Sequence, residues 1–281
     1  MLNRGARRMV VLVLVLLSLS AGPARITLVV CSPGSPGDTA QAQPTMDQLA
    51  GALAQTAGWP ADSLAAVYFE TSAGGGQRLE QGDAPAALVS LPFYYEYARA
   101  LSLVPALEAV PESGAGAVYR LVARSGALKS PATLADWEIV GGIGFSPDFV
   151  RREVLAGWGP IPDSARISFS ARPLSALRRA ASGEKIAVLL DPEQSAALPS
   201  LPFSSDLETV ATSREFPGGI FCLVKGRLPE ARAASLVDAL RKLGSSETGK
   251  AALQAIRIRE FRAIDLKRIP AAVSGTNSSH P

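Results

Sequence analysis

Short apolar segments alternate with helical segments along most of the chain. The apolar stretch 138–143 is rich in β-branched residues, and the helical stretch 174–181 ends at Ser182-Gly183, a typical helix stop. Strands are predicted at 64–70, 86–91, 117–124, 138–143, 166–169, 185–190, 207–211 and 219–224, and helices at 46–57, 92–103, 147–155, 174–181, 231–243 and 248–256. This alternation predicts an α/β fold with one or two mostly parallel sheets flanked by helices.

The N-terminus has the three parts of a secretory signal peptide. Three arginines precede an apolar run over 9–21, which is the length of a signal-peptide core and too short for a spanning helix. Ala40-Gln41-Ala42 offers the small-x-small pattern of a cleavage site, so we expect a signal peptide over 1–42 and a mature chain that begins at Gln43. The sequence therefore predicts an exported protein that acts in the periplasm or another extracytoplasmic space.

Other outcomes at this terminus stay open. Cleavage after Ala24 would leave a longer mature chain. A second apolar run, 26–30, leads to Cys31, which allows a lipid anchor, and an uncleaved leader would also tether the protein to the membrane. Residues 32–45 are rich in Ser, Pro and Gly, so we interpret them as a flexible leader tail or linker, and the small polar stretch 271–281 is expected to be disordered.

Composition excludes several classes of protein. Hydrophobic residues make up 47% and charged residues 19% of the 281, a normal balance for a globular chain. The net charge is +3, but the leader carries four arginines, so the mature chain is near neutral and no nucleic-acid partner is expected. The single histidine, His280, lies next to the C-terminus, which argues against histidine-dependent hydrolases and metal sites. With no cofactor fingerprint either, we expect neither an enzyme nor a bound cofactor or metal.

Four segments occur in a recognisable order over roughly 86–265. They are 124–137 (RSGALKSPATLADW), 175–183 with 186–191 (SALRRAASG and IAVLLD), 212–218 with Leu228-Pro229 (TSREFPG, then LP), and the helices of 240–252. In this order and spacing they resemble the phosphate/phosphite/phosphonate substrate-binding protein family of ABC transporters, as a divergent member.

That resemblance implies a type II periplasmic binding fold, in which two α/β lobes joined by two crossovers enclose a ligand. Lobe one would comprise 45–117 plus 215–270 and lobe two 118–214, with crossings near Val118 and Arg214. The implied function is a non-catalytic, monomeric solute-binding protein that captures a small anionic, phosphate- or phosphonate-like ligand and passes it to a membrane permease.

Three predicted strand-to-helix junctions, 90–94, 144–148 and 170–175, could form the ligand site. Open α/β sheets bind ligands beyond the carboxyl ends of their strands, and helix N-termini attract anions. Matched to the family pattern, the candidate ligand contacts are Ser90, Tyr94, Ser146, Arg172 and Asp191.

Departures from the family pattern keep a second function open. Pro147 lacks an N–H group, Asp148 would repel an anion, and Arg172-Pro173 stands where the family has Ser-His. The alternative is therefore an exported sensor or interaction module, for example one that contacts a membrane kinase, which keeps the fold and has lost the ligand.

Overall fold

The computed structural model describes residues 24–35 and 37–272. The basic and apolar parts of the predicted signal peptide, and nearly all of the predicted disordered tail, lie outside these residues. In the part that is described, no helix has both the length and the apolar character needed to cross a membrane.

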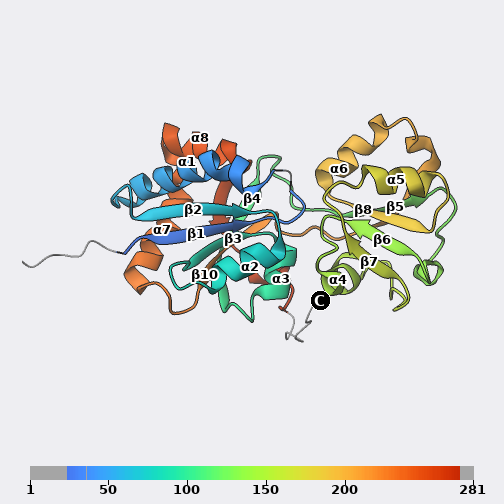
Figure 1. Ribbon diagram of the computed structural model, residues 1–281, viewed down its shortest axis with the longest axis horizontal. Helices are drawn as coiled ribbons and strands as arrows, with labels where there is room; N and C mark the ends of the chain where they lie inside the picture. The colour runs from blue at the N-terminus through green and yellow to red at the C-terminus, as the bar shows by residue number, and fades with distance from the viewer. Residues whose placement is uncertain (1–23, 36, 273–281) are drawn as a thin grey trace, which may run out of the picture.

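Lobe one is built on a six-stranded sheet with the order β11-β4-β10-β3-β1-β2 (Figure 1). Strand β1, next to the edge strand β2, is parallel to β2 and β3, whereas β10, β4 and β11 are joined by antiparallel pairs. The strands are β1 (Ile26–Cys31), β2 (Leu64–Phe69), β3 (Ala86–Val89), β4 (Leu103–Pro111), β10 (Gly219–Val224) and β11 (Ile258–Ala263).

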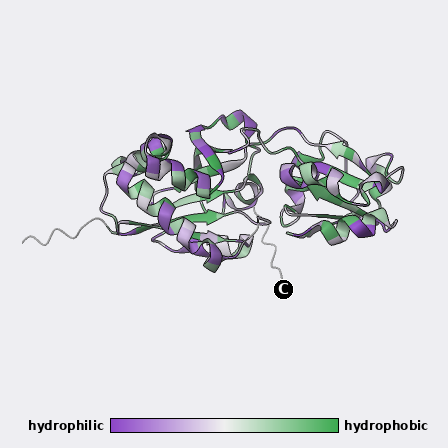
Figure 2. Ribbon diagram, turned by 90° about the horizontal axis from the view of Figure 1, so that it is seen from above, coloured by the Kyte–Doolittle hydropathy of each residue, from purple (hydrophilic) through white to green (hydrophobic). Residues whose placement is uncertain are grey.

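Helices cover both faces of this sheet. One face packs against α1 (Thr39–Ala57), α7 (Glu230–Lys242) and α8 (Glu247–Ala255), and the other against α2 (Ser72–Glu80) and α3 (Leu91–Tyr97). Figure 2 shows hydrophobic strands inside both lobes and hydrophilic residues on the outer helices. This arrangement is the normal consequence of burying two apolar sheet faces.

Lobe two has a five-stranded sheet with the order β7-β6-β8-β5-β9. Its parallel pairs are β6 with β7 and β6 with β8, and β5 is antiparallel to β8 and β9. The strands are β5 (Arg120–Arg124), β6 (Glu138–Gly141), β7 (Arg166–Phe169), β8 (Ile186–Leu190) and β9 (Leu207–Thr212), and the helices are α4 (Pro147–Phe149), α5 (Leu174–Ala181) and α6 (Pro192–Ala197). Both sheets are thus mixed, which refines the prediction of mostly parallel sheets.

Two crossover segments, 112–119 and 213–218, connect the lobes and pair with each other. Ala117 and Phe216 exchange two backbone hydrogen bonds of 2.8 and 2.9 Å, and the amide of Tyr119 donates to Ser213 Oγ at 2.9 Å. Gly116 is needed here because a Cβ would collide with the carbonyl oxygen of Phe216. The crossovers therefore form a short two-stranded hinge.

The first strand, β1, corrects the interpretation of the N-terminal region. Ile26–Cys31 is buried at every position between β2 and β3, although its apolar run was interpreted as part of a leader. Helix α1 begins at Thr39 rather than 46, because Asp38 caps it by accepting a 2.8 Å hydrogen bond from the Gln41 amide. The predicted flexible segment 32–45 is wrong over its second half, and the first element of lobe one in the described residues is a strand.

The position of β1 also bears on where the leader ends. A chain cut after Ala42 would lack strand β1, which lies between β2 and β3, and one that starts at a lipidated Cys31 would keep only its last residue. The Cys31 side chain is buried and packs so closely on Gly75 that no Cβ would fit there. We propose that the leader ends before Ile26, consistent with the alternative cut after Ala24.

Other elements escaped the sequence prediction for local reasons. Helix α2 runs through three consecutive glycines, 74–76, and two of them have a packing reason, because Gly75 lies close to Cys31 and Gly76 close to Tyr97. Strand β4 contains Pro105, which lies where the pairing with β10 shifts register, a position that tolerates proline. The short helix α6 and strand β11 were also not predicted.

Removal of β1 should abolish folding. Leu28, Val29 and Val30 each contribute about 1.5–3 kcal/mol by burial, against a total stability of about 5–15 kcal/mol. We expect a chain of residues 25–281 to unfold cooperatively in urea, and a chain of residues 43–281 to show no cooperative transition. N-terminal sequencing of the exported protein is the matching measurement, and a mature end at Gln43 would contradict the proposed cut.

Candidate ligand site between the lobes

The carboxyl ends of the parallel strands in the two sheets face each other across the junction of the lobes. Gly34, in the loop after β1, lies so close to Gly142, in the loop after β6, that a Cβ on Gly34 would approach the Gly142 carbonyl oxygen to 2.8 Å. Ligand crevices of open α/β sheets form at such strand ends. The backbones of the two lobes are therefore in direct contact where the fold predicts a ligand.

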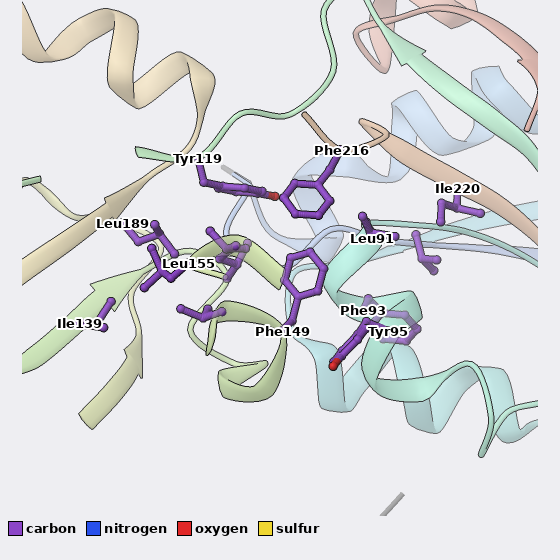
Figure 3. Packing of buried hydrophobic residues seen from close by; sticks show 14 of the residues in the cluster. Leu91, Phe93, Tyr95, Tyr119, Ile139, Phe149, Leu155, Leu189, Phe216 and Ile220 are labelled. Carbon is purple, nitrogen blue, oxygen red and sulfur yellow. The ribbon is translucent and has the colours of Figure 1, made fainter. Parts of the chain in front are cut away.

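An aromatic joint, defined here as Tyr95, Tyr119, Phe149 and Phe216, fills the junction (Figure 3). Phe149 of α4 is completely buried, and its ring centroid lies 5.3 Å from that of Tyr95 on α3 and 5.3 Å from that of Phe216 in the crossover. The ring centroids of Tyr119 and Phe216 lie 6.2 Å apart. One apolar cluster therefore includes residues of both lobes, and the lobes are closed on each other.

A hydrogen bond between the lobes lies beside this joint. Ser146 is completely buried after β6, and its hydroxyl donates to Glu96 Oε2 on α3 at 2.9 Å. Hydrogen bonds to an ionised acceptor are stronger than neutral ones. The hydroxyl proton of Ser146, a predicted ligand contact, is thus committed to a carboxylate of the opposite lobe.

Ser90 lies at the corresponding place in lobe one, between β3 and α3. Its amide donates to the carbonyl of Cys31 at 3.2 Å, but its buried Oγ has no hydrogen-bond partner among the described residues. A buried polar group without a partner costs about 1–3 kcal/mol. Ser146 bonds to Glu96 near the C-terminal end of α3, the helix whose N-cap is Ser90.

Two further candidates, Arg172 and Tyr94, differ in their exposure and surroundings. Arg172 is exposed in the loop after β7, and its amide donates to Ser170 Oγ at 3.3 Å. Tyr94 is half-buried against the apolar cluster of the joint, and burial raises the pKa of its hydroxyl, with a smaller contribution from Cys222. The structure thus places Ser146 at a contact between the lobes, while Tyr94 packs into apolar surroundings and Arg172 is exposed.

Asp191 follows β8 and begins α6 rather than a simple turn. Its carboxylate accepts from the Gln194 amide at 2.8 Å, and its own amide donates to the Gln194 side chain at 3.2 Å, forming a reciprocal cap. Burial raises the pKa of the Asp191 carboxyl above its ordinary value. Its negative charge also contributes to the raised pKa of Tyr119, so Asp191 lies near one edge of the aromatic joint.

Several residues at the junction were missed by sequence analysis. Ser32 and Ser35, whose hydroxyl oxygens are 2.8 Å apart, follow β1 and were hidden in the presumed leader. Glu70 follows β2 and accepts a 2.9 Å hydrogen bond from Thr39 Oγ1. A strand at 26–31 would have marked the two serines, but nothing in the local sequence identifies Glu96 as the partner of Ser146.

Among the described residues, charges of both signs lie around the junction, where Arg214 packs on Phe216 of the joint. Carboxylates of Glu70, Glu96 and Asp191 follow or face the strand ends, and the predicted cation, Arg172, is exposed. Within residues 24–35 and 37–272, no group of three or more His, Cys, Asp or Glu side chains could hold a metal ion. The site can offer serine hydroxyls to a ligand, but each anion would meet acidic neighbours.

No protein-family model matches the chain, and no curated protein matches its sequence. Its structure is similar to XAC2383 from Xanthomonas citri bound to chloride, with 13% identity and a TM-score of 0.67 over 86% of this chain and 94% of that one. A binding-protein component of an ABC phosphonate transporter from Pseudomonas aeruginosa has 16% identity and a TM-score of 0.61 over 87% of this chain and 83% of its own. PhnD1 from Prochlorococcus marinus, in complex with methylphosphonate, has 13% identity and a TM-score of 0.59 over 86% of this chain and 94% of its own.

These similarities establish the fold. The chain has the two-lobed α/β architecture of periplasmic binding proteins, as the sequence resemblance implied. The similar structures include binding proteins of phosphonate transporters, the family that the sequence segments resemble. At identities below 20% they do not transfer a ligand.

Replacement of Phe149 should destabilise the whole molecule. We expect Phe149→Ala to lower the free energy of unfolding by about 3–5 kcal/mol, since it leaves a cavity between Tyr95 and Phe216. The control is Phe169→Ala, at a ring that is 44% exposed, which should cost below about 1 kcal/mol. Urea denaturation measures both, and equal losses would contradict a special role for the joint.

Stability should depend on pH through Asp191. A raised carboxyl pKa means that the folded state favours the protonated form, so stability falls as pH rises through the ordinary value of about 3.9 and then the raised value. Asp191→Asn keeps a good helix cap and removes the buried charge. We expect the variant to be more stable than the parent at neutral pH and equal to it at the acid end, as measured by urea denaturation across that pH range. A difference in the free energy of unfolding between variant and parent that does not change with pH would contradict the raised pKa of Asp191.

Proposed function

We propose that this protein is an exported, monomeric solute-binding protein that captures a small anionic ligand between its lobes and delivers it to the permease of an ABC transporter. The unpartnered, buried hydroxyl of Ser90 at the strand-end junction carries the proposal, because it is a hydrogen-bond donor available to a ligand. The proposed role needs no catalytic step and no cofactor.

The names of the similar structures support an anion as the ligand. XAC2383 was solved with chloride and with ATP, and PhnD1 with methylphosphonate. In this chain Ser90 would donate from lobe one and Ser146 from lobe two, while Arg172 would add a positive charge from the rim. Tyr94 and Asp191 complete the proposed contacts, Asp191 through its position at the end of β8.

The ligand must compete with Glu96. The hydroxyl of Ser146 has one proton, which the Glu96 carboxylate accepts in the closed molecule, so an anion gains this donor only when Glu96 gives it up. When only a fraction of the molecules is competent to bind, the apparent affinity is reduced in proportion to that fraction. Glu96 therefore occupies, as an internal anion, the place on Ser146 that we assign to the ligand.

Calorimetric titration with phosphate, phosphite, methylphosphonate and sulfate tests this proposal. We expect Glu96→Gln to bind the preferred anion about tenfold more tightly, since it removes a charged competitor for Ser146. Ser90→Ala should weaken binding about three- to tenfold.

The matched control is Ser245→Ala, whose hydroxyl lies at the end of α7 and donates to the Lys242 carbonyl. It should leave the affinity unchanged. If no anion binds the parent chain or the Glu96→Gln variant, the anionic ligand is excluded.

A second candidate is an exported sensor or interaction module that has lost the family ligand. The observation that favours it is the aromatic joint, which closes the lobes through apolar packing of Phe149. For this function the lobes should stay closed with and without every tested solute, as measured by small-angle X-ray scattering. A ligand-dependent change in the radius of gyration would favour the solute-binding proposal instead.

A further inference from the structure

The segment that follows β11, residues 264–272, leaves the sheet of lobe one. Ile264, Ile269 and Ala272 pack against the apolar cluster that contains the aromatic joint, and Pro270 is buried. Figure 1 shows this red end of the described chain beside α3, on the side of lobe one that faces lobe two. The segment thus leaves its sheet and ends at the junction of the lobes.

Arg268, in the 3-10 turn Leu266–Arg268, anchors this segment. Its guanidinium contacts both carboxylate oxygens of Glu108 at 3.4 Å and Glu215 Oε1 in the crossover at 2.9 Å. The Glu108 side chain is only 4% exposed, and Arg262 binds it through two further hydrogen bonds of 3.0 and 3.1 Å. A buried carboxylate in lobe one therefore fixes the segment next to the hinge.

A second arginine connects the segment to lobe two. Arg214, in the returning crossover, donates to the carbonyl of Arg268 at 3.3 Å and to Glu153 of lobe two at 3.2 Å. Its guanidinium also lies 4.1 Å from the ring centroid of Phe216. Because the guanidinium is a rigid planar fork, it can make both hydrogen bonds only while Glu153 and the segment keep this relative position.

We propose that residues 264–272 form a strap that holds lobe two against lobe one and sets the population of the open state. Rotation at the paired crossovers would move Glu153 away from the Arg268 carbonyl, so opening must break at least one hydrogen bond of Arg214. The strap therefore opposes opening whether or not a ligand is present.

Spin labels on the two lobes test the strap in the complete mature chain. Asp62→Cys in lobe one and Ser205→Cys in lobe two provide exposed labelling sites, and both native cysteines are buried and would not react. We expect Arg214→Gln to raise the ratio of open to closed molecules about two- to fivefold, the range expected for one exposed ion pair. Double electron–electron resonance without any ligand measures the ratio.

The matched control is Arg179→Gln, which removes an exposed ion pair with Glu184 that lies within lobe two. It should leave the distance distribution unchanged. If Arg214→Gln and Arg179→Gln give the same distribution as the parent, Arg214 does not couple the strap to lobe two, and the proposal fails.

Two truncated chains distinguish a strap between the lobes from a segment that only stabilises lobe one. A chain that ends at Arg268 loses Ile269, Pro270 and Ala272, whereas a chain that ends at Ala272 keeps them. We expect only the shorter chain to show more open molecules and faster hydrogen exchange at the Ala117 and Phe216 amides, with unchanged protection in β4 and β11. Equal behaviour of the two chains, or loss of protection throughout β4 and β11, would overturn the proposal.

Discussion

The shared apolar core between the lobes is the constraint on which the rest of the molecule depends. Phe149 reaches from lobe two into a space between α3 and the crossover, so each lobe provides part of the other's core. Separation of the lobes would expose this surface to water, which costs free energy in proportion to the area. The lobes therefore favour contact even without a ligand, and the hinge, the Ser146–Glu96 hydrogen bond and the strap all act on this equilibrium.

The sequence predicted the architecture well because alternating strands and helices are a local signal. It failed at β1, since a fully buried strand and a signal-peptide segment are both short apolar runs and periodicity cannot separate them. This failure had a further consequence, because the missing strand also concealed Ser32 and Ser35. Pro105 in β4 and the glycines of α2 concealed further elements, since tertiary contacts decide their conformation.

The candidate site was predictable only in part. Ser90 and Ser146 follow strands and precede helices, so their position at strand ends could be predicted from the pattern. Their chemical state could not, because the hydroxyl of Ser146 bonds to a residue 50 positions away on the other lobe, and the Ser90 hydroxyl has no hydrogen-bond partner among the described residues. Glu108 shows the same limit: it is a charged residue in a buried strand position, and only the fold brings Arg262 and Arg268 to it.

Glu96 limits which ligands the proposed site can favour. It is held near Ser146 by the same chain, so it competes as an intramolecular acceptor at a high effective concentration. A ligand with a single carboxylate would exchange one such hydrogen bond for another and gain little. A tetrahedral oxyanion presents more acceptor oxygens than a carboxylate, so in the proposed site it could bond to further donors while one oxygen replaces Glu96 on Ser146. We therefore propose that, in this site, the internal carboxylate favours phosphate- or phosphonate-like ligands over simple carboxylates, provided that the ligand also offsets the cost of opening the apolar joint.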